Sequence, residues 1–320
     1  MQSPIITILI CSHNPRKDYL SQVLEALRRQ TLEKAAWELL IIDNASSSPL
    51  MKDYDLYWHP MARHLSVSQL GKTHALLQGV YEARGNILVI VDDDNVLAPD
   101  YLSNVVVIFN ENPSLGVIGG RIKGEFEVEP PEWAKPYLIF LAIIDLGDQP
   151  FYSASFAEFA YVPPGAGMAL RRIVAQDYAR QIKSDSLRQG FDPVGKKLSR
   201  AGDTDMALCA LDMGLAKGYF PELRLTHLIP KGRLELKYMQ ALVEGSEYSI
   251  TLLSLIRGLI LPQTVLPRWR QRLFDLRQQF KNRNADPTQL IELARERGRA
   301  SAHACYLTSC SSESHDNPML

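Results

Sequence analysis

The amino-acid sequence predicts an α/β fold in which a mostly parallel sheet is flanked by helices. Three observations support this prediction. Several short runs are apolar on both faces, segments with apolar residues at helical spacing separate them, and each run ends in polar residues. Strands that alternate with helices pair in parallel through right-handed crossovers, so we expect the polar residues to meet at one edge of the sheet.

The first predicted unit is a strand followed by a helix. The run "IITILICSH" (5–13) is rich in β-branched residues. Asn14 then offers an N-cap and Pro15 suits the first helical position, ahead of the helical pattern "YLSQVLEALRRQ" (19–30). These signals predict a buried strand that leads through a short polar loop into an amphipathic helix.

Two further strands are predicted before residue 96. The second, "WELLIIDNAS" (37–46), is apolar until it meets an acid, and after a polar turn a helix is expected in "GKTHALLQGVYEAR" (71–84), with Gly85 as its C-terminal cap. The third is "NILVIVDDDN" (86–95), in which five apolar residues precede three carboxylates and an amide. Repulsion opposes such a cluster of acids, and a bound cation would compensate for it.

The pattern is looser in the second half of the chain. We expect a loop with an exposed Trp133, a glycine turn in "VPPGAGMALRR" (162–172), and an acidic turn that leads into a helix in "LSRAGDTDMAL" (198–208). The predicted division is a main domain at residues 1–250, a helical extension at 251–300 and a disordered Ser-rich tail at 301–320.

Composition limits the expected partners and the expected location of the chain. The chain has 320 residues, 46% hydrophobic and 22% charged, with a formal net charge of −1. We therefore expect no bulk attraction to nucleic acid. Four cysteines without a CxxC pair, and an N-terminus without signal-peptide features, predict a reducing, cytoplasmic location.

A peripheral contact with the inner face of a membrane is left open by two segments. The apolar run at 249–266 is broken by Arg257, Gly258 and Pro262, which favours a core helix over an in-plane membrane helix. The stretch at 268–283 is basic and amphipathic, and it suits a membrane, a neighbouring subunit or a solvated helix equally.

The triple acid is the strongest chemical signal. Asp92 and Asp94 are two residues apart at a strand end, so both can turn to the same side. Mg²⁺ or Mn²⁺ commonly takes one or two carboxylates and leaves its other positions to phosphates and water. The alternative is an acidic turn in which Asp94 or Asn95 caps the next segment.

Two weaker signals flank the triple acid. Asp43 ends a buried strand, where it could accept hydrogen bonds from a ribose hydroxyl or a base N–H, or simply form a turn. Lys72 follows Gly71 at a helix start, where it could meet a phosphate or remain a solvated charge.

Three groups of polar residues lie near the end of the main domain. Asp203 and Asp205 sit at a helix N-terminus, where one could act as a general base or cap the helix. His227 could complete a metal site, while Lys231 and Arg233 suit a pyrophosphate; the alternative is a surface loop.

In these motifs the chain resembles the inverting, GT-A-fold glycosyltransferases of family 2. The resemblance runs from about Ile5 to about Glu247 and includes the order and spacing of "IIDNASS", "VIVDDDN" and "LSRAGDTDMAL". It implies transfer of a sugar from a nucleotide-diphosphate sugar, a UDP-sugar above all, to an acceptor hydroxyl, with inversion, in polysaccharide or glycoconjugate synthesis. The acceptor would be a glycan, a lipid-linked sugar or another hydroxyl.

The resemblance also implies roles for individual residues. Those assigned to the nucleotide and donor follow the predicted strands: Ser12, Asn14, Asp43, Lys72, Asp92 and Asp93. Asp92 and Asp94 match the family's Asp-x-Asp motif, with Asp94 the most direct ligand of Mn²⁺ or Mg²⁺ and His227 near it. Lys231 and Arg233 would lie on the diphosphate side.

On the acceptor side, Asp203 matches the catalytic base. The family often has Glu-Asp at this motif, whereas Gly202 precedes Asp203 here, so Asp205 stays a second candidate. Trp133 and the turn that contains Gly167 would line the sugar and acceptor.

Two alternatives to a glycosyltransferase stay open. A haloacid-dehalogenase-like phosphatase also carries an Asp-x-Asp-x-Val motif, but its motif ends the first strand rather than the third. A non-catalytic nucleotide-sugar or glycan-binding scaffold would share the fold, although Asp92, Asp94 and Asp203 are all intact.

Overall fold

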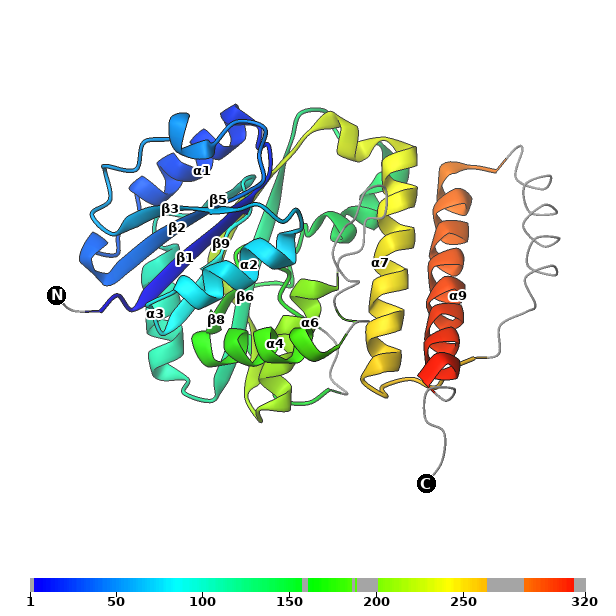
Figure 1. Ribbon diagram of the computed structural model, residues 1–320. Helices are drawn as coiled ribbons and strands as arrows, with labels where there is room; N and C mark the ends of the chain where they lie inside the picture. The colour runs from blue at the N-terminus through cyan, green and yellow to red at the C-terminus, as the bar shows by residue number, and fades with distance from the viewer. Residues whose placement is uncertain (1–2, 157–160, 186–187, 189–200, 264–284, 314–320) are drawn as a thin grey trace, which may run out of the picture. The chain divides into compact units, whose positions relative to one another are not determined.

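The computed structural model describes residues 3–156, 161–185, 188, 201–263 and 285–313, and it divides into two compact units (Figure 1). The first unit contains a nine-stranded sheet with the strand order β3-β2-β1-β4-β8-β6-β9-β5, and β7 pairs with β9. Strands β3, β2, β1 and β4 are parallel, β6 is parallel to β9, and β8 joins the two groups through antiparallel pairs. The predicted α/β fold is confirmed.

Strands and helices alternate through much of the chain. The strands are β1 Ile6–Ser12, β2 Trp37–Asn44, β3 Ala62–Val67, β4 Ile87–Ile90, β5 Asn95–Leu97, β6 Leu115–Phe126, β7 Phe151–Ser153, β8 Ala169–Arg171 and β9 Ala216–Ile229. The helices are α1 Lys17–Arg28, α2 Lys72–Glu82, α3 Tyr101–Glu111, α4 Arg172–Ser184, α6 Gly202–Asp212, α7 Leu236–Ile256 and α9 Pro287–Glu313.

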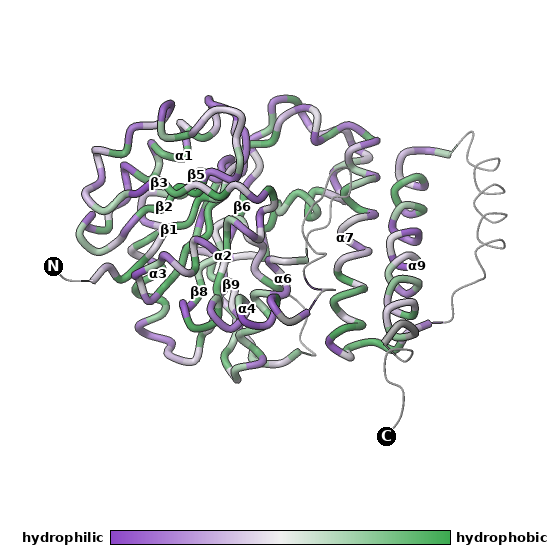
Figure 2. The backbone as a smooth tube through the Cα atoms, viewed as in Figure 1, coloured by the Kyte–Doolittle hydropathy of each residue, from purple (hydrophilic) through white to green (hydrophobic). Residues whose placement is uncertain are grey.

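Helices cover both faces of the sheet. Apolar residues of α1 and α3 pack on one face and those of α2, α4 and α6 on the other, which gives two separate buried clusters. The central strands carry the hydrophobic colour in Figure 2, and all eight residues of β2 are buried. This two-sided burial explains why these strands are apolar throughout instead of alternating.

Between the second and third predicted strands, the structure has a strand that was not predicted from the sequence. β3 (Ala62–Val67) lies at the edge of the sheet, next to β2, and its residues are half-buried or exposed. Its sequence, ARHLSV, is more polar than the central strands, so a pattern search for apolar runs passes over it. The strand with the triple acid is consequently the fourth in chain order, β4, although it pairs directly with β1.

The start of helix α1 also differs from the prediction. Arg16 occupies the N-cap position and the helix begins at Lys17, whereas Asn14 has a positive φ of 49° in the loop before it. Asparagine tolerates the left-handed region better than most residues. Asn14 therefore shapes the loop after β1 and does not cap the helix.

The second unit contains helices α7 and α9, which are joined by ion pairs. Glu247 pairs with Arg295 and Arg299 at 2.8 Å each, and Glu244 pairs with Arg297 at 2.8 Å. Helix α9 extends to residue 313, so the structure has a helix over residues 301–313, where the sequence predicted a disordered tail.

Among the described residues no helix is both long and apolar enough to span a bilayer. The basic amphipathic stretch at 268–283 lies outside the described residues.

Candidate active site

The polar residues predicted to converge do so at the carboxyl ends of the parallel strands. Ser12 ends β1, Asp43 lies next to the end of β2, and Asp92 to Asp94 follow β4. Ser12 pairs in register with Asp43, which places the two strand ends side by side. Ligands bind beyond this edge in open α/β sheets.

The three consecutive acids turn to three different partners. Asp92 Oδ1 accepts a hydrogen bond from Lys72 Nζ at 2.8 Å. Asp93 accepts one from the buried Ser12 hydroxyl. Asp94 Oδ2 lies 3.3 Å from Nε2 of His227. Each carboxylate thus has a polar partner from a different element.

Asp94 and His227 form a buried pair. Asp94 and His227 are each 5% exposed, and Asn95 donates to the other oxygen of Asp94 at 3.0 Å. The Nδ1 of His227 lies 2.9 Å from the carbonyl oxygen of Leu141. A proton on Nδ1 serves that hydrogen bond and leaves the Nε2 lone pair directed at Asp94.

This pair fits a divalent metal as two of its ligands. Two ligand atoms about 2.1 Å from one ion, at a right angle, lie about 3.0 Å apart, close to the separation of Asp94 Oδ2 and His227 Nε2. Within the described residues, no three His, Cys, Asp or Glu side chains form a metal cluster. In the arrangement that the structure describes, the protein thus offers two ligands, and phosphate and water would supply others.

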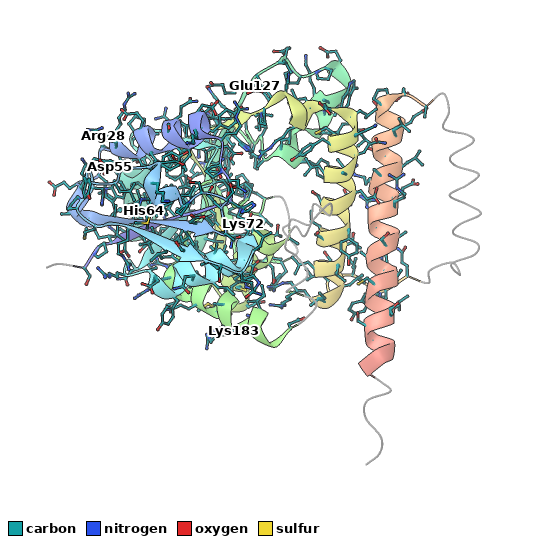
Figure 3. All side chains as sticks on the ribbon, turned by 45° about the horizontal axis from the view of Figure 1, so that its top comes forward. Arg28, Asp55, His64, Lys72, Glu127 and Lys183 are labelled. Carbon is teal, nitrogen blue, oxygen red and sulfur yellow. The ribbon has the colours of Figure 1, made fainter. Side chains whose placement is uncertain are left out.

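Lys72, labelled in Figure 3 at the start of helix α2, connects two carboxylates from distant elements. Besides Asp92, its Nζ lies 3.7 Å from Oδ2 of Asp203. Burial alone would lower the pKa of Lys72, but Asp203 and Asp92 outweigh it and raise the pKa above its usual value. Lys72 is therefore a permanent cation between the acids of β4 and those of α6.

Asp43 holds the loop after β2. Its carboxylate accepts hydrogen bonds from the backbone N–H of Ser46 at 2.9 Å and of Leu50 at 3.0 Å. Burial would raise the pKa of Asp43, but the hydrogen bonds from Leu50 and Ser46 together bring it below the usual value. Asp43 is thus ionised and stabilises the turn after β2, which was one of its two predicted roles. It is 7% exposed, so little of it is accessible to a nucleoside.

The loop after β1 is tied to the loop after β2. Asn14 Oδ1 accepts hydrogen bonds from both the backbone N–H and the hydroxyl of Ser47, each at 2.9 Å. Its backbone N–H donates to Ser46 Oγ at 3.0 Å. The predicted donor loop is thus held in place by its neighbour along the sheet edge.

Asn44 has a positioning role that was not predicted from the sequence. Its amide donates to the carbonyl of Gln69 at 2.7 Å and accepts from the N–H of Gly71 at 2.8 Å. These bonds fix the start of α2 and therefore the backbone of Lys72. The feature of the sequence that could have indicated this role is the position of Asn44 at the end of a buried strand, next to Asp43.

The two acids at the N-terminus of α6 have different surroundings. The side chain of Asp203 is 29% exposed and lies near Lys72. The side chain of Asp205 is fully buried, 3.7 Å from Nη1 of Arg188. Asp203 is therefore the more accessible of the two acids, and the acceptor-side role of Asp205 stays a prediction.

The glycine turn before β8 lies beside Asp203. A Cβ built on Gly165 would lie 2.5 Å from Cγ of Asp203, so the carboxylate rests directly on this glycine. Gly167, by contrast, is buried with a φ of 75°, and its carbonyl accepts a hydrogen bond from the hydroxyl of Tyr101 at 2.5 Å. Gly165 borders the candidate base, while Gly167 shapes the turn.

Three predicted residues belong to the second unit. They are Trp133, which is half-buried, and Lys231 and Arg233, which lie in a short 3₁₀ helix (Lys231–Leu234). Their predicted roles at the acceptor and the diphosphate therefore stay predictions.

Comparison of the sequence with known protein families identifies the family to which the chain belongs. The sequence profile described as Glycosyl transferase family 2 matches residues 7–177. The glucosyl-dolichyl phosphate glucuronosyltransferase of Haloferax volcanii is 19% identical over 129 residues, which are 40% of this chain and 41% of that protein. The chain thus spans less than half the length of this relative.

Solved structures share the fold. The mannosyltransferase PcManGT from Pyrobaculum calidifontis, in complex with GDP-Man and Mn²⁺, has a TM-score of 0.53 at 17% identity, covering 99% of this chain and 82% of that one. S. aureus TarS 1–349 in complex with UDP-GlcNAc has a TM-score of 0.50 at 14% identity, covering 78% of this chain and 65% of that one.

Proposed function

The chain belongs to glycosyl transferase family 2, and from this premise we propose that it transfers a sugar from a nucleotide-diphosphate sugar to an acceptor hydroxyl, with inversion. The observation that carries the proposal is the linkage of Asp92, Lys72 and Asp203, which sets a metal-side carboxylate, a cation and a half-exposed carboxylate side by side. Asp203 is the base and Lys72 meets a donor phosphate.

Asp94 and His227 would hold the divalent metal, Mn²⁺ or Mg²⁺. Asp92, two residues from Asp94, now pairs with Lys72. It would become available as a further metal ligand if Lys72 turned to the phosphates of a bound donor. The metal would supply positive charge to the diphosphate as it leaves. Ser12, Asn14, Asp43 and Asp93 support this site from the strand ends.

The proposed sugar transfer is a single displacement at the anomeric carbon. The acceptor oxygen bonds to the anomeric carbon while the bond from that carbon to the diphosphate oxygen breaks, and the hydroxyl proton passes to Asp203. Attack opposite the leaving group inverts the anomeric configuration. Because Asp203 is partly exposed whereas Asp205 is buried against Arg188, the geometry favours Asp203 as the base.

We propose a UDP-sugar as the donor and a glycan or lipid-linked sugar as the acceptor. The UDP-GlcNAc complex of TarS and the dolichyl phosphate in the name of the Haloferax relative support these choices, and the GDP-Man complex of PcManGT makes GDP-sugars the first comparison. We further propose that Trp133 lines the acceptor side and that Lys231 and Arg233 contact the diphosphate.

Calorimetric titration of UDP, GDP and dTDP, first with Mn²⁺ and then with EDTA, tests the donor site. We expect one nucleotide to bind only with the metal, and Asp94→Asn to weaken that binding at least tenfold. Asp148→Asn, at a carboxylate that is 86% exposed and pairs with Arg121, is the matched control and should bind as the wild type does.

The binding result selects the second experiment. If a nucleotide binds, its sugar conjugates are screened for hydrolysis and transfer, and tight metal-dependent binding without turnover would point to a non-catalytic scaffold. If no nucleotide binds in either condition, the proposed function is wrong.

A further inference from the structure

Gly165, in the turn before β8, lies so close to the carboxylate of Asp203 that a side chain at this position would overlap with it. From this geometry we infer that Gly165 is a positioning residue for Asp203, because its missing side chain is the space that the carboxylate occupies. The inference rests on the proposed role of Asp203 as the base. It assigns the glycine a task in catalysis that is separate from lining the acceptor site.

The distances leave no room for a methyl group. A Cβ on Gly165 would lie 2.5 Å from Cγ and 2.9 Å from Oδ1 of Asp203, and closer still to Oδ2. All three separations are well inside van der Waals contact, so one of the partners would have to move. Gly165 does not have a positive φ, so alanine would meet this contact without backbone strain.

The backbone of the turn is fixed from several sides, so the carboxylate is the partner that moves. The N–H of Met168 donates to the carbonyl of Gly165 at 3.3 Å, and the N–H of Ile90 in β4 donates to the carbonyl of Met168 at 2.8 Å. The hydroxyl of Tyr101 holds the carbonyl of Gly167. These bonds attach the turn to the central sheet and to α3.

On another side, the carboxylate meets a cation. Oδ2 of Asp203 lies 3.7 Å from Nζ of Lys72, which Asp92 holds at 2.8 Å. Gly165 and Lys72 therefore define the place of Asp203 together. A displacement of about 1 Å away from the glycine would move the base relative to the acceptor hydroxyl, and such a shift can cost about 100-fold in rate.

The test is a double-mutant cycle with Gly165→Ala, Asp203→Ala and the double variant. In the wild-type background we expect Gly165→Ala to lower kcat by about 30- to 100-fold, with the Kd for the donor nucleotide unchanged within about threefold. In the Asp203→Ala background the carboxylate is gone, so the added methyl group should change kcat by less than about twofold.

Gly202→Ala is the matched control, because it adds a methyl group one residue before the base. Among the residues that the structure describes, its Cβ would meet only the hydroxyl of Tyr178 at 3.4 Å, an ordinary contact, so kcat should stay within about twofold of the wild type. A Gly165→Ala enzyme with a normal kcat, or one equally impaired with and without Asp203, would overturn the inference.

Thermal unfolding of the wild type, the two single variants and the double variant tests the contact even if no activity is detected. If Gly165→Ala lowers Tm only when Asp203 is present, the steric contact is real, and an equal drop in both backgrounds contradicts it. Wild-type protein that transfers no sugar would refute the proposed function instead, and this outcome is distinct because the stability cycle does not depend on activity.

Discussion

Protonation of one buried histidine should set the acid stability of the sheet domain. His59 is 3% exposed and its ring lies 4.0 Å from that of Trp37, the first residue of β2. Burial, with a smaller contribution from Lys34, lowers its pKa from 6.5 to about 4. Replacing it by His59→Phe keeps an aromatic ring and removes the titration.

The size of the effect depends on the difference between the two pKa values. The unfolded chain takes up the proton near pH 6.5 and the folded protein only near pH 4, so stability falls as the pH decreases through this window. The full difference corresponds to about 3 kcal/mol, of which about 2 kcal/mol is lost between pH 7 and pH 5. Well below the folded-state pKa the penalty is constant.

Urea unfolding of both proteins at pH 7 and pH 5 measures this difference. Relative to the wild type, we expect the free energy of unfolding of His59→Phe to become about 2 kcal/mol larger, so that the variant is the more stable by that increment, on going from pH 7 to pH 5. Tyr57→Phe, at an exposed ring two residues away, should show no such change. A difference between His59→Phe and wild type that is the same at both pH values would refute the reasoning.

Three further substitutions test other features. Lys72→Met removes the cation beside Asp92, and calorimetry should show at least tenfold weaker nucleotide binding, whereas an unchanged Kd would exclude the phosphate contact. Asp205→Asn leaves Arg188 without its buried carboxylate partner, so urea unfolding should show a loss of about 3 kcal/mol while the nucleotide Kd stays the same. Glu38→Gln, at a carboxylate 1% exposed inside β2, should cost about 2 kcal/mol by the same method, and a neutral result would mean that the amide replaces its hydrogen bonds.

The central strands and their polar ends could be predicted because burial on both faces leaves an uninterrupted apolar signal. The edge strand β3 could not, since its half-exposed residues lack that signal. The helical extension was predicted, but the end of α9 from residue 301 was missed for a related reason: its Ser-rich sequence is polar and resembles a tail, yet it continues the helix that pairs with α7.

The directions of the acidic side chains could not be predicted either. The spacing of Asp92 and Asp94 indicated that both can turn to the same side, but it could not indicate that Lys72 from α2 and His227 from β9 would be their partners. The contact of Gly165 with Asp203 joins residues 38 positions apart, and only the tertiary fold creates it.

The run of three acids is tolerated because each carboxylate has a partner from a different element. Lys72 comes from α2 and Ser12 from β1, so the charges of Asp92 and Asp93 are offset even before a metal binds, while Asp94 faces Nε2 of His227 in β9, where a metal would offset its charge. The three pairs are therefore coupled, because removing one partner exposes its carboxylate to the other two. In urea unfolding, substitutions at Lys72 and Ser12 should destabilise the protein more in combination than the sum of their separate effects, and Mn²⁺ should reduce that excess.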